Sequence, residues 1–210
     1  MNKRASSISA VIIAGIITSV IFVEGGFTND PDDAGGKTKY GITERTARAY
    51  GYTGRIEDLT REQATSIYEV LYVREPHFYE MVNINPAVAH KLIDAGINVG
   101  TCRVAKWFQK SLNAYSRGGA DYPLIREDCS IGKSTLESYQ ALERIRGKVK
   151  ACSLVLKALD GYQTQYYLSL TKYSKFTVGW VDKRIGNVPI SQCRKYNLSI
   201  PLLGDEDENS

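Results

Sequence analysis

The chain has 210 residues, of which 43% are hydrophobic, 24% charged and 10% aromatic. This composition is typical of a globular protein with a real core, and it excludes a disordered chain, a collagen-like repeat and a coiled coil. The formal charge is +4, from 27 Lys and Arg against 23 Asp and Glu, and residues 1–204 carry +8 because four acidic residues stand at 205–208. A basic body suits nucleic acid, anionic lipid or an acidic wall polymer, so charge alone does not identify the partner.

The first feature along the chain is a segment of 19 residues without a charge, residues 5–23, which lies between Lys3-Arg4 and Glu24. As a helix it would be about 28 Å long, close to the thickness of a hydrocarbon core. Serine, threonine and glycine dilute its Ile and Val residues, which makes insertion marginal. A cleaved signal peptide and a buried soluble helix remain alternatives, although residues 19–23 lack a small residue at both positions of a cleavage site. Lys3 and Arg4 predict a cytoplasmic N-terminus, with the chain after residue 23 outside the inner membrane.

The remaining chain is predicted to be mainly α. A glycine- and aspartate-rich stretch, residues 25–43, is expected to be a loop or short β element. Capping and periodicity signals then predict helices in the order 43–50, 64–72, 87–99, 104–113, 134–147, 150–170 and 176–185. Looser sequence at 115–129 suggests a junction. We therefore expect an N-terminal helix (1–23), a catalytic region (24–114), a helical region (115–186) and a C-terminal tail (187–210).

The four cysteines, Cys102, Cys129, Cys152 and Cys193, suit an oxidising compartment, where an even number can pair completely. They allow three connectivities, and none can be read from the sequence. There is no C-x-x-C motif or Cys/His cluster, and the two histidines are 13 positions apart. We expect neither a metal site nor a cofactor.

Glu24 is a candidate for acid catalysis because it ends the hydrophobic segment, where partial desolvation would raise the pKa of its carboxyl group. Cleavage of a glycosidic bond needs such an acid, together with a second carboxylate or another way of activating water. Two glycines follow Glu24 and would let a bulky polymer approach it closely. The structural alternative is a polar residue that merely closes a helix.

Several motifs occur in the order expected of one family. The string EGGFTNDPDDAGGKTKYGIT at residues 24–43 resembles the signature of the N-acetylmuramidases of glycoside hydrolase family 108. The string DAGINVG at 94–100 is similar to the family's D-x-x-x-N-x-G helix, and AKWFQ at 105–109 continues the match. Residues 128–136 and Gly179-Trp180 with Arg184 resemble its peptidoglycan-binding C-terminal region, except that Cys129 stands where the family has glycine. The departure at Cys129 suggests a disulfide and leaves the usual turn there in question.

The resemblance implies a lysozyme-like α+β catalytic region in which Glu24 is the general acid. The reaction would be hydrolysis of the β-1,4 bond between N-acetylmuramic acid and N-acetylglucosamine. Asp33 follows nine residues after Glu24, a spacing similar to that of phage lysozymes, and is the candidate second carboxylate, with Asp30 and Asp32 as rivals. Thr43, or alternatively Thr38, would position the water.

Three further residues are candidate substrate ligands. Asp94 and Asn98 are four residues apart, so a helix places them on one face, where they would bind sugar amides or else cap a neighbouring loop. Tyr40 would stack on a sugar ring, although most of the 14 tyrosines must serve packing or the surface.

The junction of residues 5–23 with Glu24 is similar to that of signal-arrest-release endolysins, whose weakly hydrophobic helix leaves the membrane when the proton-motive force collapses. The resemblance implies a monomeric phage endolysin for host cell lysis, held in the host inner membrane by residues 5–23 and then soluble in the periplasm, with peptidoglycan glycan strands as substrate and no nucleic-acid partner. A lytic transglycosylase and a membrane-anchored, non-catalytic peptidoglycan-binding protein are the alternative functions.

Overall fold

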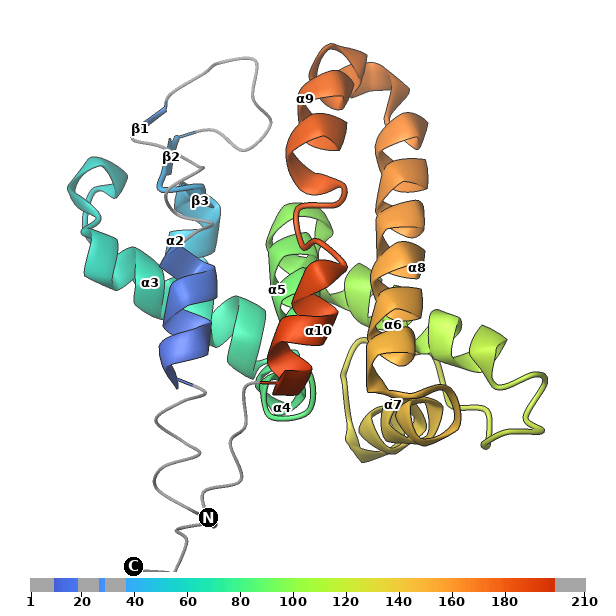
Figure 1. Ribbon diagram of the computed structural model, residues 1–210. Helices are drawn as coiled ribbons and strands as arrows, with labels where there is room; N and C mark the ends of the chain where they lie inside the picture. Colours follow the sequence, from blue (N-terminus) through green and yellow to red (C-terminus); the bar gives the residue numbers. More distant parts are fainter. Residues whose placement is uncertain (1–9, 19–26, 29–36, 199–210) are drawn as a thin grey trace, which may run out of the picture.

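The computed structural model describes residues 10–18, 27–28 and 37–198, and within these residues the chain is predominantly helical (Figure 1). The mainly α prediction is therefore confirmed. Most of the apolar side chains form one hydrophobic core that draws on the N-terminal segment, the small sheet and helices along the rest of the described chain.

Residues 10–18 are helical, and this helix has two distinct faces. Ile16 and Ile17 are buried in the core, and Ile12 and Ile13 pack against it. The opposite face is exposed and carries Ala14 and Gly15 together with the larger Val11. Among the described residues, no helix is both long enough and apolar enough to cross a membrane.

A small antiparallel sheet follows, with β1 (Phe27–Thr28), β2 (Thr38–Lys39) and β3 (Ile42–Thr43) in that order. The β2–β3 connection has two residues, Tyr40 and Gly41, because Lys39 pairs with Ile42. Both connecting residues have positive φ, 54° and 74°, as a type I′ turn requires. The predicted β element between residues 25 and 43 is thus present where the structure describes it.

The next segment covers one side of the core. Thr43 caps α2 (Glu44–Tyr50). Thr60 and Gln63 form the predicted capping box at the start of α3 (Arg61–Glu69). The elements here are α2 (Glu44–Tyr50), the 3₁₀ helix η1 (Ile56–Asp58), α3 (Arg61–Glu69), the π-helix η2 (Val70–Arg74) and α4 (Tyr79–Val82).

The central helix is α5 (Pro86–Val99), which contacts η2, α4 and α6 as well as α8 and α10. Pro86 is at its first turn and Asn85 caps it. Figure 1 shows α2 and α3 on one side of α5 and α8 on the other. The remaining elements are α6 (Thr101–Tyr115), α7 (Lys133–Arg146), the 22-residue α8 (Lys148–Ser169), η3 (Thr171–Tyr173), α9 (Ser174–Arg184) and α10 (Ser191–Leu198).

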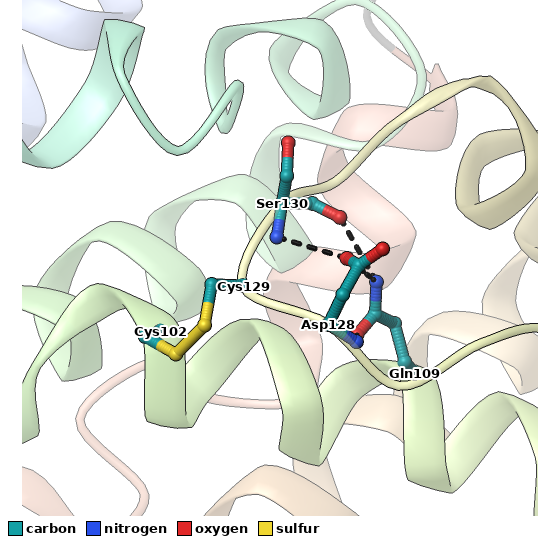
Figure 2. Close-up of a disulfide and its surroundings, with 5 residues drawn as sticks. All are labelled: Cys102, Gln109, Asp128, Cys129 and Ser130. Carbon is teal, nitrogen blue, oxygen red and sulfur yellow. Dashed lines mark hydrogen bonds between the residues drawn. A yellow bond between two sulfur atoms is a disulfide. The ribbon is translucent and has the colours of Figure 1, made fainter.

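All four cysteines pair, Cys102 with Cys129 and Cys152 with Cys193. The first disulfide joins α6 to the loop before α7, beside a compact turn (Figure 2). In this turn Asp128 Oδ1 accepts a hydrogen bond from the Ser130 amide at 3.0 Å, and Gln109 Oε1 accepts one from the Asp128 amide at 2.7 Å. Cysteine in place of the family's glycine therefore coexists with a hydrogen-bonded turn at this point.

The predicted regions 24–114 and 115–186 pack closely against each other. Helices α5 and α6 from the first contact α8 from the second, and α7 also packs on α6. Within the predicted tail, residues 191–198 form α10, which contacts α5 and α8 and is joined to α8 through Cys193. The part of the predicted tail up to residue 198 is therefore a helical element of the fold.

Candidate functional site

The two catalytic carboxylates predicted from the sequence, Glu24 and Asp33, lie outside the described residues. Their neighbours along the chain are described. Glu24 comes three residues before β1, and Asp33 belongs to the connection between β1 and β2. The register Phe27–Lys39 and Thr28–Thr38 defines the two strands that this connection joins.

Thr38 and Thr43, the alternative water-positioning residues, lie directly opposite each other on β2 and β3. Opposed residues of an antiparallel pair project from the same face of the sheet, so their side chains are neighbours. The Thr43 hydroxyl caps α2, where it accepts from the Thr46 amide at 3.0 Å, and it lies 2.9 Å from the Thr46 hydroxyl. Thr38 has no hydrogen bond from its hydroxyl to another described residue. The Thr43 hydroxyl is therefore already used within the fold.

Tyr40 holds the sheet to the helical body. Its backbone carbonyl accepts a hydrogen bond from the hydroxyl of buried Tyr68 at 2.8 Å, which supports the positive φ of the turn. Two cations face its ring, with Lys39 Nζ at 5.4 Å and Arg61 Cζ at 5.6 Å from the ring centroid. The ring is already engaged within the fold, and its predicted stacking on sugar would have to displace or add to these contacts.

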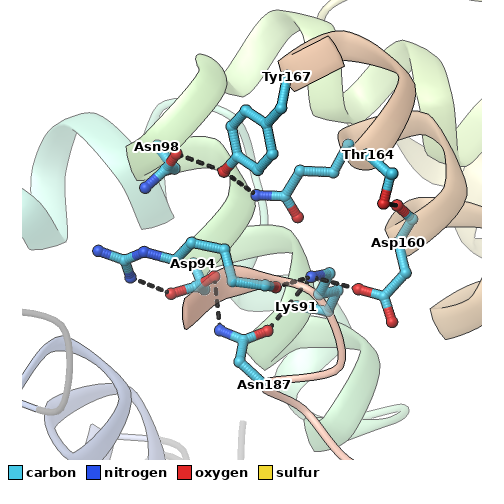
Figure 3. A network of polar contacts seen from close by, with 9 residues as sticks. Lys91, Asp94, Asn98, Asp160, Thr164, Tyr167 and Asn187 are labelled. Atoms are coloured by element: carbon cyan, nitrogen blue, oxygen red, sulfur yellow. Dashed lines mark hydrogen bonds and ion pairs between the residues drawn. The ribbon is translucent and has the colours of Figure 1, made fainter. Parts of the chain in front are cut away.

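Asp94 is 2% exposed and belongs to a buried network of charged and amide groups that joins α5 to the end of α9 (Figure 3). Its Oδ1 lies 2.9 Å from Arg184 Nη1, and its Oδ2 accepts a hydrogen bond from Asn187 Nδ2 at 2.8 Å. Both oxygens are thus occupied inside the protein. Of the two roles left open for Asp94 by the sequence, this geometry favours structural anchoring.

Lys91, one turn before Asp94 on α5, completes the network. It is 1% exposed, and its ammonium group donates to the Arg184 carbonyl at 2.8 Å and to Asn187 Oδ1 at 3.2 Å. It also forms an ion pair with Asp160 Oδ1 at 2.6 Å. Two hydrogen bonds and one ion pair therefore compensate this buried ammonium group. Because Asn187 contacts both Lys91 and Asp94, the chain just after α9 is fixed on α5.

Asn98, one turn after Asp94, lies in a different environment. It is partly exposed and lines a cavity of about 370 Å³ between α5 and α9. Its Oδ1 accepts a hydrogen bond from the Tyr167 hydroxyl at 2.6 Å. The other lining residues come from α9: Lys175, Phe176, Gly179, Trp180, Lys183 and Arg184. The i, i+4 spacing correctly placed Asp94 and Asn98 on one helix face, yet only Asn98 reaches this cavity.

Sequence reasoning missed most of the α9 wall. Lys175, Gly179 and Lys183 repeat every four residues, as do Phe176 and Trp180, so a helical-face analysis of this segment would have grouped them. Nothing in the local sequence connects them to Asn98, which stands 77 residues before Lys175. A second cavity of about 400 Å³, lined by residues of α2, α3 and the loop between them, contains none of the predicted site residues.

Comparison with known proteins finds one family model that matches part of the chain. Residues 17–100 match the sequence model described as glycosyl hydrolase 108, and this match includes Glu24, Asp33, Tyr40, Thr43, Asp94 and Asn98. No curated protein sequence matches the chain. Among solved structures, SagA of Brucella abortus is similar with a TM-score of 0.68 and 24% sequence identity, over 89% of this chain and 95% of that one.

These two findings establish different things. At 24% identity the likeness to SagA concerns the fold alone, over 89% of this chain. The family match concerns the activity and supports N-acetylmuramidase action on peptidoglycan. Residues 17–100 are thus similar to glycosyl hydrolase 108, and the chain is a glycoside hydrolase.

Proposed function

We propose that this chain is a phage endolysin in which Glu24 is the general acid of an N-acetylmuramidase. The family match carries the proposal, because it begins before Glu24 and continues through Asn98. The carboxyl group of Glu24 protonates the glycosidic oxygen that leaves, and Asp33 with a threonine hydroxyl of the sheet activates and holds the water. Thr38 is the threonine that we assign to this role, because the Thr43 hydroxyl already caps α2.

The test is digestion of purified peptidoglycan, with the released muropeptides identified by mass spectrometry. Wild-type protein is expected to leave reducing N-acetylmuramic acid ends, and Glu24→Gln should lower their release by at least about 100-fold. Glu75→Gln is a matched control, because Glu75 is exposed and is not one of the proposed site residues. Ends of the 1,6-anhydro type would identify a lytic transglycosylase. Equal inactivity of wild type and Glu24→Gln on an accessible wall would favour a non-catalytic binding protein.

We also propose that residues 5–23 first hold the enzyme in the host inner membrane and release it when the membrane is depolarised. The two faces of residues 10–18 support this, since the large isoleucines pack on the core and the small residues face solvent. The isoleucines of such a helix can be buried either in lipid or in the protein core. Because the rest of the helix surface is only weakly apolar, its free energy in the membrane is similar to its free energy in the released fold. After release the protein is expected to be a soluble periplasmic monomer.

Gly15 allows a sharp test of this release. A Cβ atom added at Gly15 would meet nothing within 4 Å, so leucine there raises membrane affinity without a clash in the released fold. A variant with Gly15→Leu, Ser9→Leu and Ser19→Leu should stay in the membrane fraction after treatment of cells with an uncoupler, whereas wild type and Gly15→Ser should move to the periplasmic fraction. Equal release of the leucine variant and wild type would refute the mechanism.

A further inference from the structure

The residues that line the cavity between α5 and α9 have no step assigned to them in the reaction described above. Asn98 forms one wall, and Lys175, Phe176, Trp180 and Lys183 form the other. The clamp of Lys91 and Asp94 on Arg184 and Asn187 fixes α9 on α5, so the two walls are held at a set distance before any ligand arrives (Figure 3). A pre-formed cleft of this size, with aromatic and polar groups together, is typical of small-ligand and sugar sites.

The amide of Asn98 is oriented by a chain of hydrogen bonds. Gln163 Nε2 donates to the Tyr167 hydroxyl at 2.7 Å, so the hydroxyl hydrogen is directed to Asn98 Oδ1 at 2.6 Å. The oxygen of Asn98 is therefore occupied, and Figure 3 shows its amide nitrogen turned away from Tyr167. Asn98 consequently offers N–H donors to the cavity, which suit an acceptor such as the carbonyl of an N-acetyl group.

The opposite wall contains a cluster of aromatic rings. Phe176 and Trp180 stack with ring centroids 5.7 Å apart and an angle of 28° between their planes. Tyr167 supports Trp180 from behind at 5.4 Å, and it is the same tyrosine that orients Asn98. Phe176 is 43% exposed, and Lys175 Nζ lies 4.9 Å from the centroid of its ring. Ring faces of this kind pack well against the C–H groups of a pyranose.

Two lysines define the chemical character of the ligand. Lys175 and Lys183 are exposed, and among the described residues neither forms an ion pair. They stand eight residues apart on α9, which is about 12 Å along the helix axis. An extended peptide of three to four residues covers the same distance. Arg184 cannot serve the ligand in the same way, because its guanidinium group is committed to Asp94.

These features suit one component of the substrate. We propose that the α5/α9 cleft binds the peptide-bearing N-acetylmuramic acid of peptidoglycan, with the acetylated sugar between Asn98 and Trp180 and the carboxylates of the stem peptide along Lys175 and Lys183. This inference rests on the proposed function, because it takes the wall polymer as the ligand. It adds that the enzyme recognises ionised stem peptides and so prefers peptide-substituted glycan.

The experiment compares native sacculi with sacculi whose stem carboxylates have been converted to amides with a carbodiimide and ammonia. This conversion keeps the glycan and the peptide but removes the negative charges. Wild type is expected to release reducing ends about fivefold faster from native than from amidated sacculi at limiting substrate, a ratio that should shrink as salt is raised. Lys175→Gln/Lys183→Gln should degrade both substrates at the same, lower rate.

Lys150→Gln/Lys157→Gln is the matched control. Both of these lysines are exposed on α8, outside the cleft, so this variant loses the same net charge. It should keep the fivefold ratio. If the cleft double variant also keeps that ratio, or if wild type shows no preference for native sacculi, the assignment is wrong.

A second readout separates this inference from the proposed function. The affinity of each protein for native and amidated sacculi is measured by co-sedimentation in the Glu24→Gln background. If wild type cleaves neither substrate, the proposed activity fails, but a preference for native sacculi that disappears only in the Lys175→Gln/Lys183→Gln variant still supports the cleft. Equal affinity for both kinds of sacculi would overturn the cleft whatever the activity.

Discussion

At the scale of single residues, the buried pair of Asp94 and Arg184 is the feature with the largest consequence for stability. The two side chains are 3% and 8% exposed, so neither charge can be solvated by water if its partner is lost. A buried pair is weak evidence of net stabilisation, but removal of Asp94 takes a charged partner away from the buried Arg184.

We therefore expect Asp94→Asn to lower the free energy of unfolding by about 3 kcal/mol. The measurement is urea denaturation with the disulfides intact. Glu137→Gln is the control: it removes the exposed Lys133–Glu137 pair, whose side chains are 89% and 61% exposed, and should change stability by less than about 0.5 kcal/mol. A loss for Asp94→Asn as small as that of the control would show that water reaches Arg184.

His90 makes stability depend on pH. Burial lowers the pKa of its imidazole from the usual 6.5, and this effect outweighs the opposing influence of Asp94 and of a hydrogen bond with Gln192. The unfolded chain then binds the proton more readily than the folded one. The stabilising contribution is complete above pH 6.5 and is lost as pH falls from there towards the folded pKa.

We expect the free energy of unfolding, measured by urea denaturation, to fall between pH 7.5 and pH 5.5. His90 contributes at most about 1.4 kcal/mol per pH unit to this fall. His90→Gln should flatten this part of the curve. The same slope in wild type and His90→Gln would mean that another group titrates there. Glu143 acts in the opposite sense from pH 4.5 upward, because burial raises its pKa and the folded chain then binds the proton more readily than the unfolded one.

At the scale of elements, the helix at residues 10–18 tests whether the N-terminal segment is a structural part of the folded enzyme. Ile17 is 1% exposed and Val11 is 72% exposed on the same helix. Ile17→Ala should destabilise the purified protein by about 3 kcal/mol through lost burial and a residual cavity. Val11→Ala should cost less than about 0.5 kcal/mol. Equal, small effects in thermal or urea unfolding would place this helix outside the cooperative core.

Element positions were largely predictable because their signals are local. The capping box at Thr60 and the proline at position 86 correctly marked the starts of α3 and α5. The helix α10 was missed because its sequence is mostly polar and has no clear apolar face. Its attachment depends on the Cys152–Cys193 disulfide, and the pairing of four cysteines is not encoded in their spacing.

The site was less predictable than the fold because its residues meet partners that are distant in the sequence. The spacing of Asp94 and Asn98 gave their common face, but their partners Arg184, Asn187 and Tyr167 are about 70 to 90 residues away and meet them only in the tertiary structure. Which of the two is buried and which reaches the cleft depends on those partners. Glu24 and Asp33 stay predictions from the sequence and the family.

At the scale of the whole molecule, the arrangement of α5, α6 and α8 bears on whether the chain has one cooperative unit or two. The sequence suggested a junction near residues 115–129, with a catalytic region before it and a helical region after it. In the structure α5 and α6 bury their faces against α8, and the hydrophobic core continues across the junction. Separation of the two regions would expose apolar surface on both.

The two tryptophans allow a direct test, because Trp107 belongs to the region before the junction and Trp180 to the region after it. Trp107 stacks on Tyr162 of α8, and Trp180 packs on Tyr167 of the same helix. We expect the single-tryptophan variants Trp180→Phe and Trp107→Phe each to show a fluorescence transition in urea that coincides with its own loss of helical circular dichroism. Independent regions would instead give two midpoints, with the fluorescence of one tryptophan changing before the helical signal. Coincident transitions mean that any contact which holds α9 on α5 also contributes to the stability of the region that carries Glu24.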